Sequence, residues 1–163
     1  MKTKRWAGVV GSFLSLLLVL LGAPHAAGAD NYWQHDPATP GDWFDVVNWW
    51  LGMLPTSAMW TSTYITNGGE ALITGNIAES FWLYLGYDAG ESGAVVLSDS
   101  GGLLADQASI GRYGTGWFTQ TGGTNTVERD LYLGRESGSS GTYELSGGEL
   151  SVGDSETIGQ HGT

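Results

Sequence analysis

The chain contains no cysteine. This absence excludes disulfide bonds, a thiolate nucleophile and the cysteine clusters that bind zinc. Small extracellular domains often depend on disulfides for their stability. A chain of this composition must instead gain its stability from stacked repeats, from an oligomer or from bound ions.

Positively charged side chains are also scarce, with six Lys and Arg against 17 Asp and Glu and a net charge of −11. The six are Lys2, Lys4, Arg5, Arg112, Arg129 and Arg135. A surface this acidic repels phosphate backbones and anionic lipid. The sequence therefore predicts no nucleic-acid partner and, once the N-terminal segment described below is removed, no membrane partner.

Histidine is also scarce. After residue 29 the sequence contains only His35 and His161. Neither lies in an H-x-x-x-H motif, and nothing marks a serine and an aspartate that could complete a Ser-His-Asp arrangement. The sequence assigns no catalytic, cofactor-binding or metal-binding residue. We therefore expect a protein that is not an enzyme and carries no cofactor.

Residues 1–29 have the pattern of a secretory signal peptide. A basic start is followed by the mainly apolar run Ala7–Leu21 and by Ala27-Gly28-Ala29, which resembles an A-x-A cleavage site. The alternative, an uncleaved anchor, would need about 20 apolar residues. Cleavage before Asp30 leaves three arginines against 17 acidic residues, a charge of −14, and predicts a secreted or cell-surface protein.

The chain also lacks sustained helical spacing, and it repeats itself instead. Leu83-Tyr84-Leu85-Gly86 returns 48 positions later as Leu131-Tyr132-Leu133-Gly134, and residues 83–115 match residues 131–163 at 14 of 33 positions without a gap. An aliphatic residue followed by glycine recurs at residues 86, 111, 134 and 159, at intervals of 25, 23 and 25. The period of 48 therefore contains two coils of about 24 residues.

Short alternating segments separated by glycine pairs predict strands within each coil. Tyr143 and Leu145 fall on one side of such a segment and Glu144 on the other. We predict an all-β fold, a parallel β-helix (β-solenoid); an antiparallel sandwich or barrel is the alternative. The four leucines of the two LYLG copies should face the core, and Tyr84 and Tyr132 should point outward as a stacked pair.

Residues 30–82 differ from the repeats in composition and predict an N-terminal cap that covers the first coil with aromatic side chains. Six tryptophans lie in this segment: Trp33, Trp43, Trp49, Trp50, Trp60 and Trp82. The alternative is that these rings form a platform for stacking sugars. The predicted organisation is a signal peptide (1–29), a Trp-rich cap with the first strands (30–82) and β-solenoid repeats (83–163).

Trp43, Asn48, Trp49, Gly52 and Pro55 form a W-x4-N-W-x2-G-x2-P pattern. The pattern resembles the segment that precedes the repeats of secreted bacterial β-solenoid proteins, including proteins with autotransporter-associated β-strand repeats and surface proteins with a PEP-CTERM type tail. The resemblance implies a non-enzymatic secreted or cell-surface scaffold, such as a stalk or adhesin. Extracellular polysaccharide or other cell-surface components would then be its partners.

The second hypothesis is a carbohydrate-active module, which would bind sugars through the cap aromatics or degrade an acidic polysaccharide as a β-helical lyase or hydrolase. Its candidate acids are Asp99, Asp106, Asp130 and Asp154. Asp106 and Asp154 occupy equivalent positions, which favours a repeated structural turn over an acid and base pair in different environments. Calcium is a weaker possibility, with Asp88, Glu91 and Glu136 as oxygen ligands in Gly-rich turns.

Two further expectations concern the repeats. Outward polar side chains could form a flat ladder along one face, and they are Thr119, Thr121, Thr124, Asn125 and Thr126. The sequence ends in mid-repeat, with Ile158-Gly159 in the phase of Ile110-Gly111. We expect the natural chain to continue past Thr163 and the last coil to expose a pairing edge.

Overall fold

The computed structural model describes residues 28–161 and shows an all-β fold. The strands are β1 (Asp30–Tyr32), β2 (Gly41–Asp42), β3 (Ser62–Ile65), β4 (Asn67–Thr74), β5 (Ile77–Leu85), β6 (Ser92–Ser98), β7 (Gly102–Ile110), β8 (Thr115–Val127), β9 (Asp130–Leu133), β10 (Ser140–Val152) and β11 (Ser155–Ile158). Two short 3-10 helices, η1 (Val46–Asn48) and η2 (Ser57–Met59), lie in the N-terminal part.

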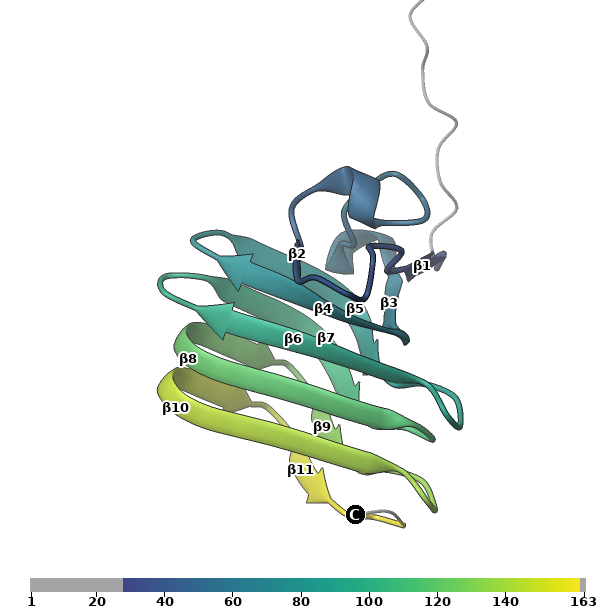
Figure 1. Cartoon of the computed structure of the whole chain (residues 1–163). Helices are drawn as coiled ribbons and strands as arrows, with labels where there is room; N and C mark the ends of the chain where they lie inside the picture. Colours follow the sequence, from purple (N-terminus) through teal and green to yellow (C-terminus); the bar gives the residue numbers. More distant parts are fainter. Residues whose placement is uncertain (1–27, 162–163) are drawn as a thin grey trace, which may run out of the picture.

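Every pairing between two of these strands is parallel. Val95 aligns with Phe118, and Phe118 aligns with Tyr143, so successive coils follow each other at the interval that the glycine spacing predicts. Figure 1 shows these coils stacked from the purple and blue N-terminal end to the yellow C-terminal end. The predicted parallel β-solenoid and its coil length are confirmed, and the antiparallel alternative is wrong.

Each coil contributes to three faces of the solenoid. The first face contains β2, β4, β6 and the first halves of β8 and β10. The second face contains the first halves of β5 and β7 and the second halves of β8 and β10. The third face contains β1, β3, the second halves of β5 and β7, β9 and β11.

The recurring glycines turn the chain from the third face toward the next coil. Gly86, Gly111, Gly134 and Gly159 all have positive φ, between 63° and 72°. A Cβ atom would lie 2.3 Å from the Thr115 carbonyl oxygen at Gly86 and 2.0 Å from the Ser140 carbonyl oxygen at Gly111. Both the backbone conformation and the close approach of the next coil require glycine at these two corners.

The sequence pattern predicted that glycine pairs separate the strands, but two of the pairs lie inside strands. β8 and β10 continue through Gly122-Gly123 and Gly147-Gly148 and bend there from the first face to the second. The register between β10 and β8 shifts on either side of Gly147. A bulge of this kind bends a strand without ending it.

The core is a stack of inward side chains from the three faces. Leu83, Leu85 and Leu131 are buried, and Leu133 packs against the same cluster, as the alternation predicts. A polar layer interrupts this core. Gln120 and Asn125 are fully or almost fully buried, which contradicts the prediction that Asn125 points outward.

Tyr143 bonds to both amides of this polar layer, in which Oδ1 of Asn125 has no hydrogen-bond partner. Its hydroxyl group donates a hydrogen bond to Oε1 of Gln120 and accepts one from Nδ2 of Asn125 at 2.9 Å. Nε2 of Gln120 donates to the carbonyl oxygen of Glu149 at 3.0 Å. Because buried amides need partners, the amide side chains are stable inside the core only with this network.

Three tryptophans close the N-terminal end of the core. Trp33, Trp43 and Trp49 are 3%, 0% and 0% exposed, and Trp49 contacts the other two edge to face with ring centroids 4.9 and 4.8 Å away. Asn48 Nδ2 donates to the Asp42 carbonyl oxygen at 2.8 Å, so its amide bonds to backbone inside the aromatic cluster. Gly52 has a φ of 63°, which explains the glycine of the W-x4-N-W-x2-G-x2-P pattern.

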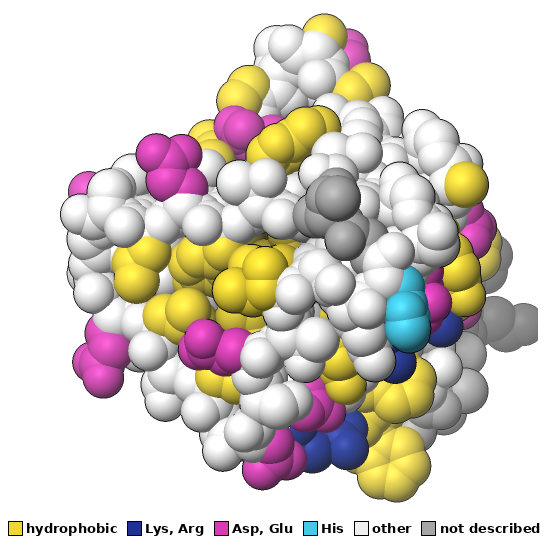
Figure 2. All heavy atoms as spheres, turned by 90° about the horizontal axis from the view of Figure 1, so that it is seen from below, with side chains coloured by type: hydrophobic (Ala, Val, Ile, Leu, Met, Phe, Trp, Pro, Cys, Tyr) yellow, Lys and Arg dark blue, Asp and Glu magenta, His cyan; other side chains and the backbone are white. Residues whose placement is uncertain are grey.

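The other end of the core lacks such a cover within the described residues. Figure 2 views this end and shows yellow apolar side chains in its centre with magenta carboxylates around them. Leu145 and Ile158 are 49% and 75% exposed there. Whether the chain continues past Thr163 stays a prediction.

The predicted signal peptide lies almost wholly outside the described residues, which begin at Gly28. Between Gly28 and His161, no helix is long and apolar enough to cross a membrane.

Candidate functional site: the tyrosine–arginine face

The outer surface of the third face carries a stack of tyrosines. Tyr32, Tyr64 and Tyr84 occupy the same position in β1, β3 and β5. Their ring centroids are 4.7 and 5.0 Å apart, with interplanar angles of 16° and 22°. Consecutive coils therefore place these rings in direct contact, at the strand spacing of roughly 4.8 Å.

The predicted stacking of Tyr84 on Tyr132 is wrong. β7 lies between β5 and β9 and places Ser109 between the two tyrosines. The LYLG motif recurs after two coils rather than one. Identical residues in its two copies are therefore separated by a coil and are not direct neighbours. The tyrosine side chains do lie opposite the leucines, but Tyr84 is covered by other side chains and only 7% exposed.

Tyr87 and Arg112 provide that cover. Tyr87 meets Tyr64 and Tyr84 edge to face, with centroid distances of 5.1 and 5.0 Å. The Arg112 guanidinium carbon lies 4.7 Å from the Tyr87 centroid, 5.7 Å from that of Tyr84 and 5.4 Å from that of Tyr113. Three tyrosine rings therefore hold one cation by cation–π contacts.

Arg135 lies beside Arg112 in the next coil. The amide groups of Arg135 and Glu136 donate to the carbonyl oxygens of Gly111 and Arg112, which fixes the two arginines in adjacent, equivalent positions. The guanidinium carbon of Arg135 is 4.3 Å from the Tyr132 centroid. Two of the three arginines beyond residue 29 therefore stand next to each other on one face of an acidic protein.

The two arginines differ in their acidic partners. Nε of Arg135 lies 3.7 Å from a carboxylate oxygen of Glu136. Arg112 has no ion pair with any residue in the described range, and its Nε is buried without a hydrogen-bond partner. A buried unpaired donor is costly, and on this face Arg112 Nε shares that state with the Ser109 hydroxyl group.

Tyr64 and Tyr84 of this face remain protonated at neutral pH. Burial raises the pKa of Tyr64 well above its usual value of 10.0. Burial also raises the pKa of Tyr84, although the positive charge of Arg112 acts in the opposite direction. Their hydroxyl groups can therefore donate hydrogen bonds over the whole physiological range.

Sequence reasoning named Arg112 and Arg135 only as scarce basic residues and did not place them together. A signal was present, because each directly follows an aliphatic-glycine corner and the two corners are consecutive, which makes them one coil apart. The third arginine lies elsewhere. Arg129 forms an ion pair with Asp106, with Nε 3.0 Å from each carboxylate oxygen.

Three of the four candidate carboxylates, Asp106, Asp130 and Asp154, lie around Arg129, whereas Asp99 is in the turn between β6 and β7. Asp106 forms an ion pair with Arg129. In the next coil, the backbone amide of Asp154 donates a hydrogen bond to the carbonyl oxygen of Arg129. Asp130 accepts hydrogen bonds from Ser155 and Gln107, which lower the pKa of its carboxyl group.

Of the suggested calcium ligands, Asp88 and Glu91 share one turn, and Glu136 is two coils away. Glu91 accepts a hydrogen bond from the backbone amide of Asp88 at 2.9 Å. Tyr113, in the intervening coil, separates Asp88 from Glu136. In residues 28–161, no group of three or more His, Cys, Asp or Glu side chains could hold a metal ion. Nδ1 of His35 contacts Asn48 at 3.0 Å in the cap, far along the chain from His161 in the last turn.

The polar ladder predicted from β8 is also absent from the described faces. Thr119 and Thr121 precede the bend of β8 and Thr124 and Thr126 follow it, so they lie on different faces. A ladder runs across coils, and the coil neighbours of Thr119 are Val96 and Glu144.

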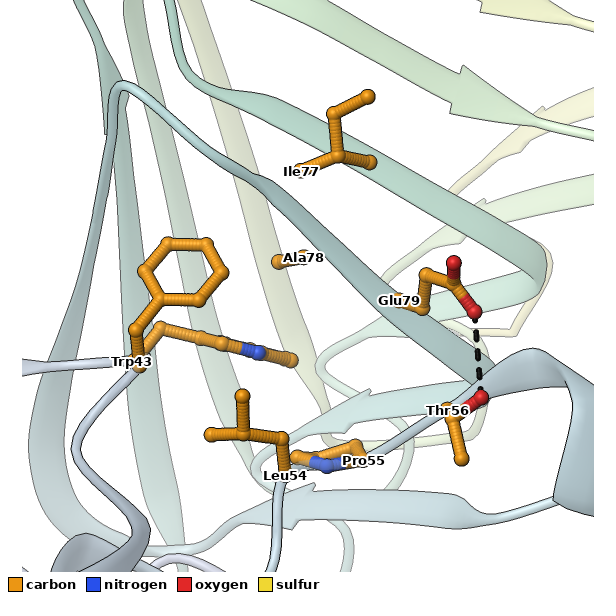
Figure 3. A pocket seen from close by; sticks show the side chains of 8 residues that line it. Trp43, Leu54, Pro55, Thr56, Ile77, Ala78 and Glu79 are labelled. Carbon is orange, nitrogen blue, oxygen red and sulfur yellow. Dashed lines mark hydrogen bonds between the residues drawn. The ribbon is translucent and has the colours of Figure 1, made fainter.

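Shallow hollows occur on the described surface, and two of them lie beside β5. One of about 260 Å³ lies between the cap and β5, where Figure 3 shows Glu79 hydrogen-bonded to Thr56 beside Trp43, Leu54 and Ile77. The same carboxylate oxygen accepts a bond of 2.9 Å from the Ser57 hydroxyl group.

The second hollow, of about 300 Å³, lies along the second face. Its lining residues are Ile77, Ser100, Gly101, Gly102, Leu103, Leu104, Thr124 and Thr126. Both volumes are at or below the lower limit of small-molecule pockets, about 300 Å³.

Only some of the six tryptophans considered for sugar stacking are exposed. Trp33 and Trp43 are inside the cap, whereas Trp50 and Trp60 are 64% and 62% exposed. Trp50 meets Tyr32 edge to face at 6.4 Å, so it extends the tyrosine stack at its N-terminal end.

Stacked parallel coils, an aromatic cap and side chains ordered in columns define a parallel β-solenoid protein. No family model matches the chain, and neither a curated protein nor a solved structure matches it.

Proposed function

We propose that this chain is a non-enzymatic scaffold, a secreted or cell-surface stalk or adhesin-like β-solenoid. The observation that carries the proposal is the in-register stacking of coils behind one closed aromatic cap. In such a solenoid each coil adds the same rise and extends the same lateral faces, which suits presentation of a long surface.

The sequence supplies the extracellular part of the proposal. The pattern of residues 1–29 resembles a signal peptide, and the absence of cysteine removes any dependence on disulfide formation after export. The high acidic charge favours solubility of a long extracellular protein.

The state of the carboxylates supports a non-enzymatic role. Asp106 is held by Arg129, and Asp130 is held by Gln107 and Ser155. An acid and base pair needs two groups whose environments separate their pKa values around one substrate.

The test is expression of the full-length chain in a bacterial host, followed by fractionation, N-terminal sequencing and protease treatment of intact cells. We expect a chain that begins at Asp30 and is found outside the cell or exposed on it. An intact N-terminus in the cytoplasm would refute the extracellular assignment. Release of unsaturated or reducing ends from acidic polysaccharides would refute the non-enzymatic one.

A second candidate, a sugar-binding module, is favoured by the exposed rings of Trp50 and Trp60. Aromatic faces of this kind stack on the apolar faces of sugars. A glycan array would test it with Trp50→Ala and Trp60→Ala, and Val47→Ala, also exposed, is the matched control. Equal binding by all three variants would exclude these rings as the platform.

A further inference from the structure

The adjacent arginines of the third face are unfavourable to each other in the free protein. Arg112 and Arg135 occupy equivalent positions in consecutive coils, at a backbone spacing of about 4.8 Å. Like charges held in neighbouring turns repel each other. With 17 acidic side chains in the sequence, Arg112 nevertheless has no carboxylate partner in the described structure.

The Nη donors of Arg112 are available to a ligand, because no hydrogen bond or ion pair in the described structure uses them, whereas its Nε is buried. The rings of Tyr84, Tyr87 and Tyr113 contact the guanidinium group as cation–π partners. Such contacts hold the group in place without satisfying its five N–H donors. The fork of a guanidinium group matches the two oxygens of a carboxylate.

The surroundings of the arginines are suited to a sugar. Tyr113 is 42% exposed and Tyr132 is partly exposed, so both offer ring surface and a hydroxyl group beside the cations. An apolar ring face next to a few polar groups is typical of a carbohydrate site.

We propose that Arg112 and Arg135 bind the carboxylate groups of an acidic, uronate-containing polysaccharide, with Tyr113 and Tyr132 against its sugar rings. A carboxylate between the two guanidinium groups removes their repulsion and supplies the acceptor that Arg112 lacks. A polyanion of higher charge density than a polyuronate, such as a heavily sulfated polysaccharide, is disfavoured, because the rest of the protein is strongly negative and repels it over a longer range.

Glu136 makes the two arginines unequal as binding groups for the ligand. At 3.7 Å from Nε of Arg135, its carboxylate competes with a ligand at that arginine. Arg112 has no such competitor in the described structure and is the primary anchor.

Affinity electrophoresis of the full-length protein in gels with polygalacturonate, dextran or dextran sulfate tests the proposal. We expect polygalacturonate to retard the protein and dextran not to retard it. Arg112→Gln should weaken binding about 10- to 100-fold, as expected for loss of a charge-assisted hydrogen-bonded pair. Arg129→Gln, which removes the same charge from the Asp106 ion pair, is the matched control and should bind like the parent.

Two more variants sharpen the test. Arg112→Lys keeps the charge without the fork and should lie between the parent and Arg112→Gln, which separates recognition from folding. Glu136→Gln should bind more tightly, because it frees Arg135.

Several results would overturn the proposal. These are no retardation by polygalacturonate, equal or stronger retardation by dextran sulfate, equal losses in Arg112→Gln and Arg129→Gln, and a Glu136→Gln protein that binds no more tightly than the parent. Binding is measured on purified protein, whereas the scaffold role is tested by the location of the chain in cells. A negative binding result is therefore distinguishable from failure of the scaffold role.

Discussion

Replacement of Gly111 by alanine tests the reason for the repeating glycine corners. Gly111 has a φ of 72°, and a Cβ atom there would lie 2.0 Å from the carbonyl oxygen of Ser140 and 2.5 Å from its carbonyl carbon. A side chain in the left-handed region costs about 1–2 kcal/mol. Because the clashing atoms are backbone of the next coil, that coil must shift, at a further cost of about 1–3 kcal/mol.

Gly90→Ala is the matched control. Its φ is 83°, also left-handed, but no atom lies within 4 Å of the position of its Cβ. This variant should therefore lose only the conformational part, about 1–2 kcal/mol. The total for Gly111→Ala, about 2–5 kcal/mol, is a large share of a typical stability of about 5–15 kcal/mol.

The measurement is the free energy of unfolding from urea denaturation, followed by circular dichroism. We expect Gly111→Ala to be less stable than Gly90→Ala by about 1–3 kcal/mol. Equal stability of the two variants, within about 0.5 kcal/mol, would show that close approach between coils does not determine the position of the glycines.

Three further outcomes follow from the core and the turns. Trp49→Ala should lower the free energy of unfolding by about 3–5 kcal/mol because its ring closes the core, whereas the 62% exposed Trp60 should tolerate alanine; equal effects would contradict the cap. Tyr143→Phe leaves Gln120 and Asn125 without their shared partner and should cost about 1–3 kcal/mol in urea denaturation, with a neutral result refuting the network. Burial raises the pKa of Tyr143 from 10.0 to about 12, so its contribution to stability is complete below pH 10 and is lost as the pH rises toward 12. Ultraviolet titration should show several tyrosines that ionise late, and Tyr143→Phe should remove one of them. A calcium chelator should leave the melting temperature unchanged, and a clear fall would establish a bound ion.

The local pattern of the fold could be predicted because it depends on near neighbours in the chain. Alternation placed Leu83 and Leu85 inward, and the glycine spacing gave the coil length. Both features follow from strand geometry and from backbone conformations that only glycine adopts readily.

The neighbours across coils were harder to predict. The obvious LYLG repeat paired Tyr84 with Tyr132, although Tyr84 contacts Tyr64, which lies one coil before it. The first described coils differ in length from the later ones, so no single period aligns the cap with the repeats. Asn125 was placed outside for a related reason, because the bend of β8 and the partner hydroxyl group of Tyr143 are invisible to alternation.

Composition and spacing alone establish a cysteine-free, acidic chain of short strands with glycine corners at residues 86, 111, 134 and 159. They do not establish which side chains share a column, since columns depend on how each coil packs on the previous one. That packing brings Arg112 and Arg135 together among tyrosines and leaves Arg112 without an acidic partner in the described structure. Contact between coils, rather than order along the chain, creates the candidate site.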